Sequence, residues 1–143
     1  MGAMSDETAT SAIDEITRLV IRYAAGFAGD AHATVEFYAL PMIHVGPDAV
    51  SVIGSREEAT AFVEGILDRL RPTGFSHTTV ERCFVRLLHR SVALCGVDGT
   101  RRRADGSPIE RIGATYVLTA HQDWRIRELI VTDPERINPW LVG

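Results

Sequence analysis

The sequence lacks long apolar runs, has only two cysteines among its 143 residues, and carries no excess of basic side chains. No apolar run approaches the ~18 residues of a membrane span, and no signal-peptide core is present, so we expect a cytoplasmic protein without a membrane partner. The net charge of −4 and the pI near 5.7 argue against a broad nucleic-acid-binding surface. We therefore predict no nucleic-acid partner.

Two cysteines are too few for a disulfide framework or a thiolate metal site. Cys83 and Cys95 lie within apolar strand patterns, so we expect both to be reduced core residues. The two cysteines do not form a Cys-x-x-Cys pair, and no glycine-rich loop leads into a helix to bind phosphate. The sequence therefore predicts no metal and no cofactor.

A chain of this length forms a single domain, which we expect over residues 11–133. Residues 1–10 are expected to form a disordered N-terminus, in which Met1-Gly2-Ala3 resembles a cloning remnant because a second methionine follows it. Residues 134–143 are expected to form a C-terminal tail, and its apolar end, residues 140–142, suits a segment that covers another surface.

Three helices are predicted in the first half of the chain. The first follows the N-cap candidate Ser11 and has apolar residues at spacings of three and four. The second begins after Asp30 and ends before Pro41, because proline cannot continue a helix. The third begins with a capping box formed by Ser55 and Glu58.

Six β-strands are predicted, separated by short segments of turn-forming residues. Two short strands follow the second helix, and four long strands follow the third and form an antiparallel meander. The predicted strands span residues 42–45, 50–53, 75–88, 91–101, 109–120 and 124–132. The fold class is therefore α+β.

This order of elements resembles the nuclear transport factor 2-like superfamily, in which a curved antiparallel sheet wraps three N-terminal helices into a cone, a cystatin-type roll. Residues 20–30 (VIRYAAGFAGD) are similar to the first helix of ketosteroid isomerases and SnoaL-type polyketide cyclases. Residues 125–128 (RIRE), followed by Asp133, are similar to the last strand of those cyclases. The resemblance implies a hydrophobic pocket for a small-molecule ligand and a homodimer through the convex face of the sheet.

Strand register, taken without bulges, predicts which residues share a face of the sheet. It places Glu128 among apolar neighbours on the face that we expect to line the pocket. Both faces are largely apolar, which favours helices over one face and a partner subunit over the other. The predicted pocket-lining residues are Phe27, Phe62, Leu94, Thr115, Val117, Trp124, Ile126 and Ile130.

Four side chains are candidates for acid–base chemistry in this pocket, namely Tyr23, His44, His77 and Glu128. A carboxyl group among apolar side chains has a raised pKa, and a nearby histidine titrates close to neutral pH, so such a pair can exchange protons with a ligand. By the resemblance, Tyr23 aligns with the isomerase tyrosine that donates a hydrogen bond to the oxyanion. The isomerase base position falls on Val45 and the second oxyanion acid on Thr115, so isomerase chemistry is not carried over.

Each candidate also has a structural interpretation. Tyr23 suits a core position with a satisfied hydroxyl, and the short strand around His44 leaves the direction of that side chain open. His77 at a strand start suits a structural role, and Glu128 suits an ion pair with Arg111 of a neighbouring strand. An isomerase- or lyase-type enzyme, a ligand-binding protein and a dimerisation module therefore all stay open.

Overall fold

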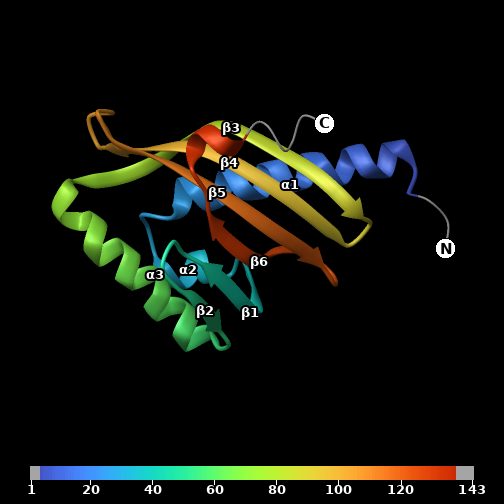
Figure 1. The fold of residues 1–143 in the computed structure, drawn as a ribbon, viewed down its shortest axis with the longest axis horizontal. Helices are drawn as coiled ribbons and strands as arrows, with labels where there is room; N and C mark the ends of the chain where they lie inside the picture. Colours follow the sequence, from blue (N-terminus) through green and yellow to red (C-terminus); the bar gives the residue numbers. More distant parts are fainter. Residues whose placement is uncertain (1–3, 138–143) are drawn as a thin grey trace.

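The computed structural model describes residues 4–137, in which three α-helices accompany one curved six-stranded sheet (Figure 1). Helix α1 (Asp6–Gly26) packs along strand β3 (Phe75–His89), and helix α3 (Arg56–Leu70) ends close to the start of that strand. The predicted fold class, an α+β cone, is confirmed. None of the helices in this part of the chain is long and apolar enough to cross a membrane.

Helix α1 begins well before the predicted N-cap Ser11. Ser5 is the N-cap, and its hydroxyl accepts a hydrogen bond from the Thr8 amide at 3.2 Å. Asp6 and Glu7 add negative charge in the first turn, which the helix dipole favours. The expected disorder over residues 1–10 is therefore wrong for residues 6–10, which are helical.

The second helix is shorter than predicted. Helix α2 (Ala31–Val35) begins after the expected cap Asp30. It ends before Phe37, whose carbonyl accepts a hydrogen bond from the Ile126 amide at 2.8 Å. Strand β1 (Tyr38–Val45) starts there, so pairing with a distant strand outweighs the local helical pattern.

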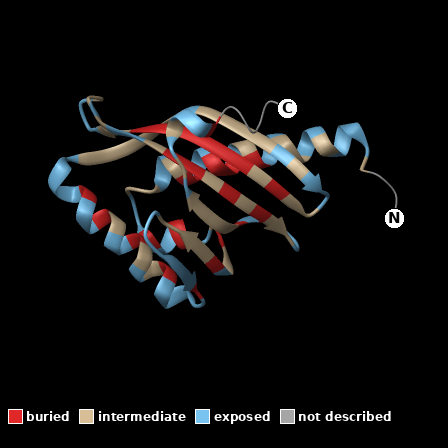
Figure 2. Ribbon diagram, in the orientation of Figure 1, coloured by how far each residue is buried: buried red, intermediate tan, exposed pale blue. Residues whose placement is uncertain are grey.

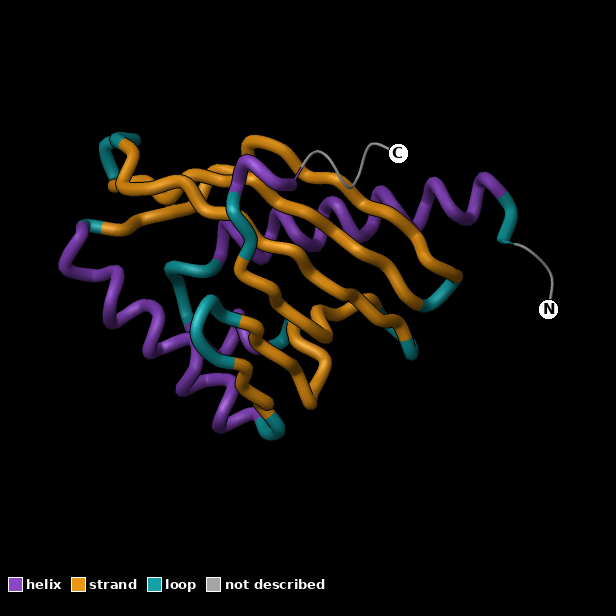
Figure 3. The backbone as a smooth tube through the Cα atoms, in the orientation of Figure 1, coloured by secondary structure: helices purple, strands orange, loops and turns teal. Residues whose placement is uncertain are grey.

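The strand order is β2-β1-β6-β5-β4-β3. Neighbouring strands are antiparallel except β1 and β6, which are parallel. The long strands agree with the predicted ones to within two residues at each end, because turn-forming residues mark their limits (Figure 3). The remaining elements are β2 (Val50–Ile53), η1 (Arg71–Thr73), β4 (Val92–Arg103), β5 (Pro108–Ala120), β6 (Trp124–Val131) and η2 (Pro134–Arg136).

A β-bulge in β6 decides which of its residues face the helices. The register between β5 and β6 shifts at Arg127, which is an extra residue of β6 with no register partner in β5. Ile126 faces the core before the bulge, and Leu129 and Val131 lie on the same concave side after it. The same shift turns Glu128 to the convex face.

The core lies between α1 and the concave face of the sheet, where buried and partly buried residues alternate along the strands (Figure 2). Cys83 and Cys95 lie on this side as free thiols, with their sulfur atoms 3.5 Å apart. The largest fully buried side chains of this core are Tyr38, Ile16, Met42, Leu118, Ile126, Val20, Val63 and Cys95. The apolar tail segment 140–142 lies outside the described residues.

The convex face contains an ion-pair network around one buried carboxylate. Asp98 of β4 is 3% exposed, and its carboxylate accepts hydrogen bonds from Arg82 of β3 at 2.6 and 3.0 Å. Arg111 of β5 donates to the same carboxylate at 3.2 and 3.3 Å and reaches Glu135 of η2 at 3.7 Å. Because η2 crosses in front of the sheet in Figure 1, this network joins the described end of the chain to the sheet.

Candidate functional site

A cavity of about 620 Å³ lies between α1, α3 and the concave side of the sheet. Helix α1 contributes Tyr23 and Ala24, β1 contributes His44, and strands β5 and β6 contribute Tyr116 and Leu129. Helix α3 borders the cavity through one of its faces, with Phe62, Ile66, Arg69 and Leu70. Side chains from distant parts of the sequence therefore meet around one space.

Tyr23 is 4% exposed and lies at the centre of an aromatic cluster. Its hydroxyl is 2.6 Å from the Tyr38 hydroxyl, and its ring packs edge-on against four aromatic rings at centroid distances of 5.6–5.9 Å. Burial raises the pKa of Tyr23, Tyr38 and Tyr116 above the ordinary value of 10.0. These phenols are therefore neutral at physiological pH and act as hydrogen-bonding groups.

His44 reaches the cavity from β1. Its ring is tilted against Phe62 at a centroid distance of 4.9 Å. Burial lowers the pKa of the His44 imidazole below 6.5, and the positive charge of Arg69 lowers it further. The ring is therefore neutral at pH 7 and has a nitrogen lone pair that can accept a proton.

Arginine side chains place positive charge at the borders of the cavity. Arg101 of β4 pairs with Glu110 of β5 at 2.5 Å, and its charge opposes the rise in the pKa of Tyr23. Arg69 comes from the last turn of α3. The cavity thus combines uncharged acid–base groups in its wall with cations at its borders.

Glu128 does not line the cavity, and its predicted placement is wrong. The bulge at Arg127 turns it to the convex face, where it is half-buried and in register with Ile43 and Val117. The alternative prediction, an ion pair with Arg111, is also wrong within residues 4–137, because Arg111 pairs with other carboxylates.

His77 also lies away from the cavity. It is in register with Arg102 of β4. The next residue pair along these two strands borders the cavity, so His77 lies on the opposite face of the sheet. Of the four candidates, the structure brings together Tyr23 and His44. Whether either side chain takes part in a reaction stays a prediction.

The predicted lining residues divide into three groups. Phe27 and Phe62 border the cavity. Trp124 and Ile126 are buried in the core instead. The other four lie on the convex face, namely Leu94, Thr115, Val117 and Ile130. A shift of one residue along a strand exchanges the two faces of the sheet.

The same phase change affects the positions aligned with the isomerase base and acid. Val45 is in register with Ile130, which places it on the convex side together with Thr115. Their chain neighbours His44 and Tyr116 border the cavity. The residue of β1 that faces the cavity is therefore a histidine, which can act as a base.

Sequence reasoning missed Tyr116, Arg69 and Arg101. A signal existed for Arg69, which lies seven residues after Phe62 and so projects from the same face of α3. Tyr116 and Arg101 could be placed only with the correct phase of the strands that carry them.

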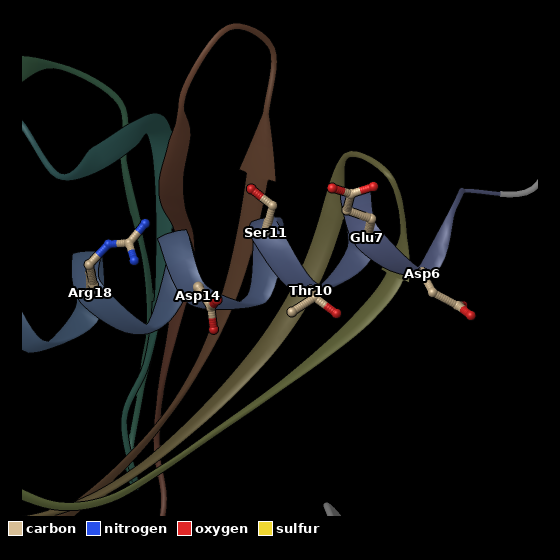
Figure 4. Close-up of a pocket in the computed structure, with 6 residues that line it drawn as sticks. All are labelled: Asp6, Glu7, Thr10, Ser11, Asp14 and Arg18. Atoms are coloured by element: carbon tan, nitrogen blue, oxygen red, sulfur yellow. The ribbon is translucent and has the colours of Figure 1, made fainter.

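A second depression lies along the exposed side of α1 (Figure 4). Its side chains all come from this helix and point into solvent, so we interpret it as solvated helix surface. The bordering residues are Asp6, Glu7, Thr10, Ser11, Asp14 and Arg18.

Comparisons with known proteins agree with this architecture. The model of a family described as NTF2-like protein (DUF6841) matches residues 6–134. No curated protein matches the chain.

Three solved structures illustrate the likeness of fold. An NTF2-like protein with a cystatin-like fold from Novosphingobium aromaticivorans is 18% identical, with a TM-score of 0.66 and coverage of 91% of this chain and 88% of that one. A candidate scytalone dehydratase from the same species is 13% identical, with a TM-score of 0.66 and coverage of 89% and 87%. A candidate calcium/calmodulin-dependent protein kinase II association domain from Xanthomonas campestris is 20% identical, with a TM-score of 0.61 and coverage of 82% and 84%. At these identities the likeness establishes the fold alone.

Proposed function

This chain belongs to the NTF2-like family DUF6841, and we propose that it binds a small, largely apolar organic molecule in the cavity, where His44 exchanges a proton with that ligand. One observation carries the proposal. A neutral histidine and a neutral tyrosine hydroxyl, from β1 and α1, border the same partly apolar space of about 620 Å³.

The proposed chemistry is acid–base catalysis without a cofactor. Since the His44 imidazole is unprotonated at pH 7, it can take a proton from a carbon or oxygen acid and return it elsewhere on the ligand. When the Tyr38 hydroxyl donates to Tyr23, the Tyr23 hydrogen is free to bind a ligand oxygen that gains negative charge. This assignment suits isomerase-, cyclase- or dehydratase-type proton transfer.

A ligand-binding protein without turnover is the second candidate. It is favoured by the Tyr23 hydroxyl, which already has a partner in Tyr38, and by the position of Glu128, whose carboxylate lies on the other face of the sheet. Binding and proton transfer therefore need separate tests.

Binding is tested with N-phenyl-1-naphthylamine, an uncharged dye that fluoresces in apolar sites. We expect saturable binding, and we expect Ala24→Trp to weaken it about tenfold because the new ring fills part of the cavity. Ala25→Trp is the matched control, since Ala25 is the next residue of α1 and is exposed. Equal dissociation constants for the two variants would contradict a ligand site in the cavity.

Proton transfer is tested with 5-nitro-1,2-benzisoxazole. A base removes its C–H proton while the N–O bond breaks, which releases a coloured phenolate. We expect His44→Gln to slow this elimination at least about tenfold and Glu128→Gln to leave it unchanged. If His44→Gln binds the dye normally and retains the wild-type rate, the ligand-binding candidate replaces the catalytic one.

A homodimer through the convex face is also part of the proposal. Register places mostly apolar side chains in rows across this face, from the exposed edge strand β2 through β1 and β6 to β5 and β4, with Glu128 standing in one row between Ile43 and Val117. Val50 and Val52 at the edge are 67% and 66% exposed, which favours cover by a second copy.

Sedimentation equilibrium tests this arrangement. We expect a species of twice the 15.7 kDa chain mass, and we expect Ile130→Arg to shift it to the monomer because a charge would enter the uncharged row that contains Val45 and Val50. Ile21→Arg, on the exposed side of α1, is the control. A monomeric wild-type protein would rule the dimer out.

A further inference from the structure

The borders of the cavity carry more positive than negative charge, although the chain has a net charge of −4. Three arginines and two carboxylates border it, namely Arg69, Arg101, Arg111, Glu110 and Asp133. Arg101 pairs with Glu110, while Arg111 and Asp133 pair with residues outside the cavity wall. Arg69 has no ion-pair partner among residues 4–137.

The position of Arg69 on α3 explains why its charge is available at the cavity. It follows Phe62 and Ile66 on the face of the helix that borders the cavity. The adjacent carboxylate of Asp68 is engaged by Arg71 and does not neutralise it. A cation in the last turn also interacts favourably with the helix dipole, but that interaction does not require a side chain at the cavity border.

The lining of the cavity changes from a charged side chain at Arg69 to aromatic rings beyond His44. Arg69 and His44 border the same cavity, and the positive charge of Arg69 contributes to the lowered pKa of the His44 imidazole. Beyond His44 the wall becomes aromatic, with the ring of Phe62 packed against the imidazole. A ligand that satisfies this arrangement has an apolar body and one anionic group.

We propose that the cavity takes a small organic anion, whose apolar body lies against Phe27 and Phe62 and whose carboxylate or sulfonate group is bound by Arg69. The proposal deepens the proposed function and rests on ligand binding in this cavity. A guanidinium presents two parallel N–H donors that match the two oxygens of such a group, so arginine suits this role. A neutral His44 beside it can donate one further hydrogen bond or accept a proton.

Two dyes with the same aromatic framework test the charge preference. 8-Anilino-1-naphthalenesulfonate carries a sulfonate that N-phenyl-1-naphthylamine lacks. We expect Arg69→Gln to raise the dissociation constant of the sulfonate about fivefold and to leave that of the uncharged dye unchanged. Arg90→Gln is the matched control, because Arg90 is exposed in the turn at the far end of β4 from Arg101.

Further measurements connect the effect to the cavity. Ala24→Trp should weaken the binding of both dyes. Raising the ionic strength should weaken the binding of the sulfonate to wild type more than to Arg69→Gln, since salt screens an exposed ion pair.

If the uncharged dye binds and Ala24→Trp weakens its binding, but Arg69→Gln changes neither dissociation constant, the anion preference is wrong and the ligand cavity stands. If Arg69→Gln weakens both dyes equally, the charge is not recognised and the inference is also wrong. If Ala24→Trp affects neither dye, the ligand cavity itself is wrong.

Discussion

The polar groups on the two faces of the sheet differ in charge and in pairing. On the concave side, Tyr23 and His44 are neutral polar groups beside an open volume. On the convex side, the Asp98 carboxylate is buried and accepts hydrogen bonds from two arginines. On the convex side arginines thus compensate a buried carboxylate, while the neutral groups Tyr23 and His44 line the cavity and the charge offered to a ligand, that of Arg69, is exposed at its border.

The largest expected effect is on the convex side. Asp98→Ala should lower the free energy of unfolding by about 1.5–3 kcal/mol, because it removes the charge-assisted hydrogen bonds that Arg82 and Arg111 make to a buried carboxylate. Urea denaturation monitored by tryptophan fluorescence measures this change. Asp68→Ala removes an exposed ion pair with Arg71 and should cost less than about 1 kcal/mol. Similar losses of unfolding free energy for the two variants would contradict the distinction between a buried, paired carboxylate and an exposed ion pair.

The next effect concerns the crossing of the chain at Gly113. A Cβ atom there would lie 2.3 Å from the Thr132 carbonyl oxygen and 2.8 Å from the Pro134 nitrogen, and backbone atoms cannot move aside cheaply. Gly113→Ala should therefore cost about 1–3 kcal/mol by denaturation. Gly65→Ala is the control, because nothing lies within 4 Å of its Cβ position in α3, and it should stabilise the protein by about 0.5–1 kcal/mol. Stabilisation by both alanines would contradict the close crossing.

A smaller effect is expected on the concave side. Tyr23→Phe removes one hydroxyl of the pair and leaves the buried Tyr38 hydroxyl unsatisfied, at a cost of about 1–2 kcal/mol. The double variant with Tyr38→Phe should cost less than the sum of the single variants, as measured by a double-mutant cycle. Additive costs would show that the two hydroxyls do not depend on each other.

The smallest effect is the pH dependence of His44. Its folded pKa lies below the ordinary 6.5, so between these two values the unfolded chain binds more protons than the folded one. The contribution of His44 to stability should therefore be constant well above pH 6.5 and fall as the pH decreases below that value. His44→Gln should reduce this fall, measured by urea midpoints, whereas the exposed control His121→Gln should not. The same decline in wild type and His44→Gln would argue against a buried neutral imidazole.

The turns, and the N-caps of the second and third helices, were accessible from the sequence, because they depend on local chemistry. The capping box predicted at Ser55 and Glu58 is present, with the Ser55 hydroxyl accepting a hydrogen bond from the Glu58 amide at 3.2 Å. The order of helices and strands follows from the same local signals. Residues 38–40 were assigned to a helix instead of a strand because their partner, β6, is distant in sequence.

The faces of the sheet were not accessible, because the bulge at Arg127 changes the phase of β6 by one residue. Strand register predicted without bulges placed Glu128 on the wrong face of the sheet. A trace of the bulge is visible in the sequence, since two adjacent polar residues, Arg127 and Glu128, separate Ile126 from Leu129 and interrupt strict alternation.

The most direct test of the central claim is a crystal structure of the protein with N-phenyl-1-naphthylamine. We predict density for the naphthyl ring in the cavity, between Phe27 and Phe62, with Tyr23 and His44 as the nearest polar side chains. Density on the convex face beside Glu128, or a cavity closed by its own side chains with the dye elsewhere, would contradict the account.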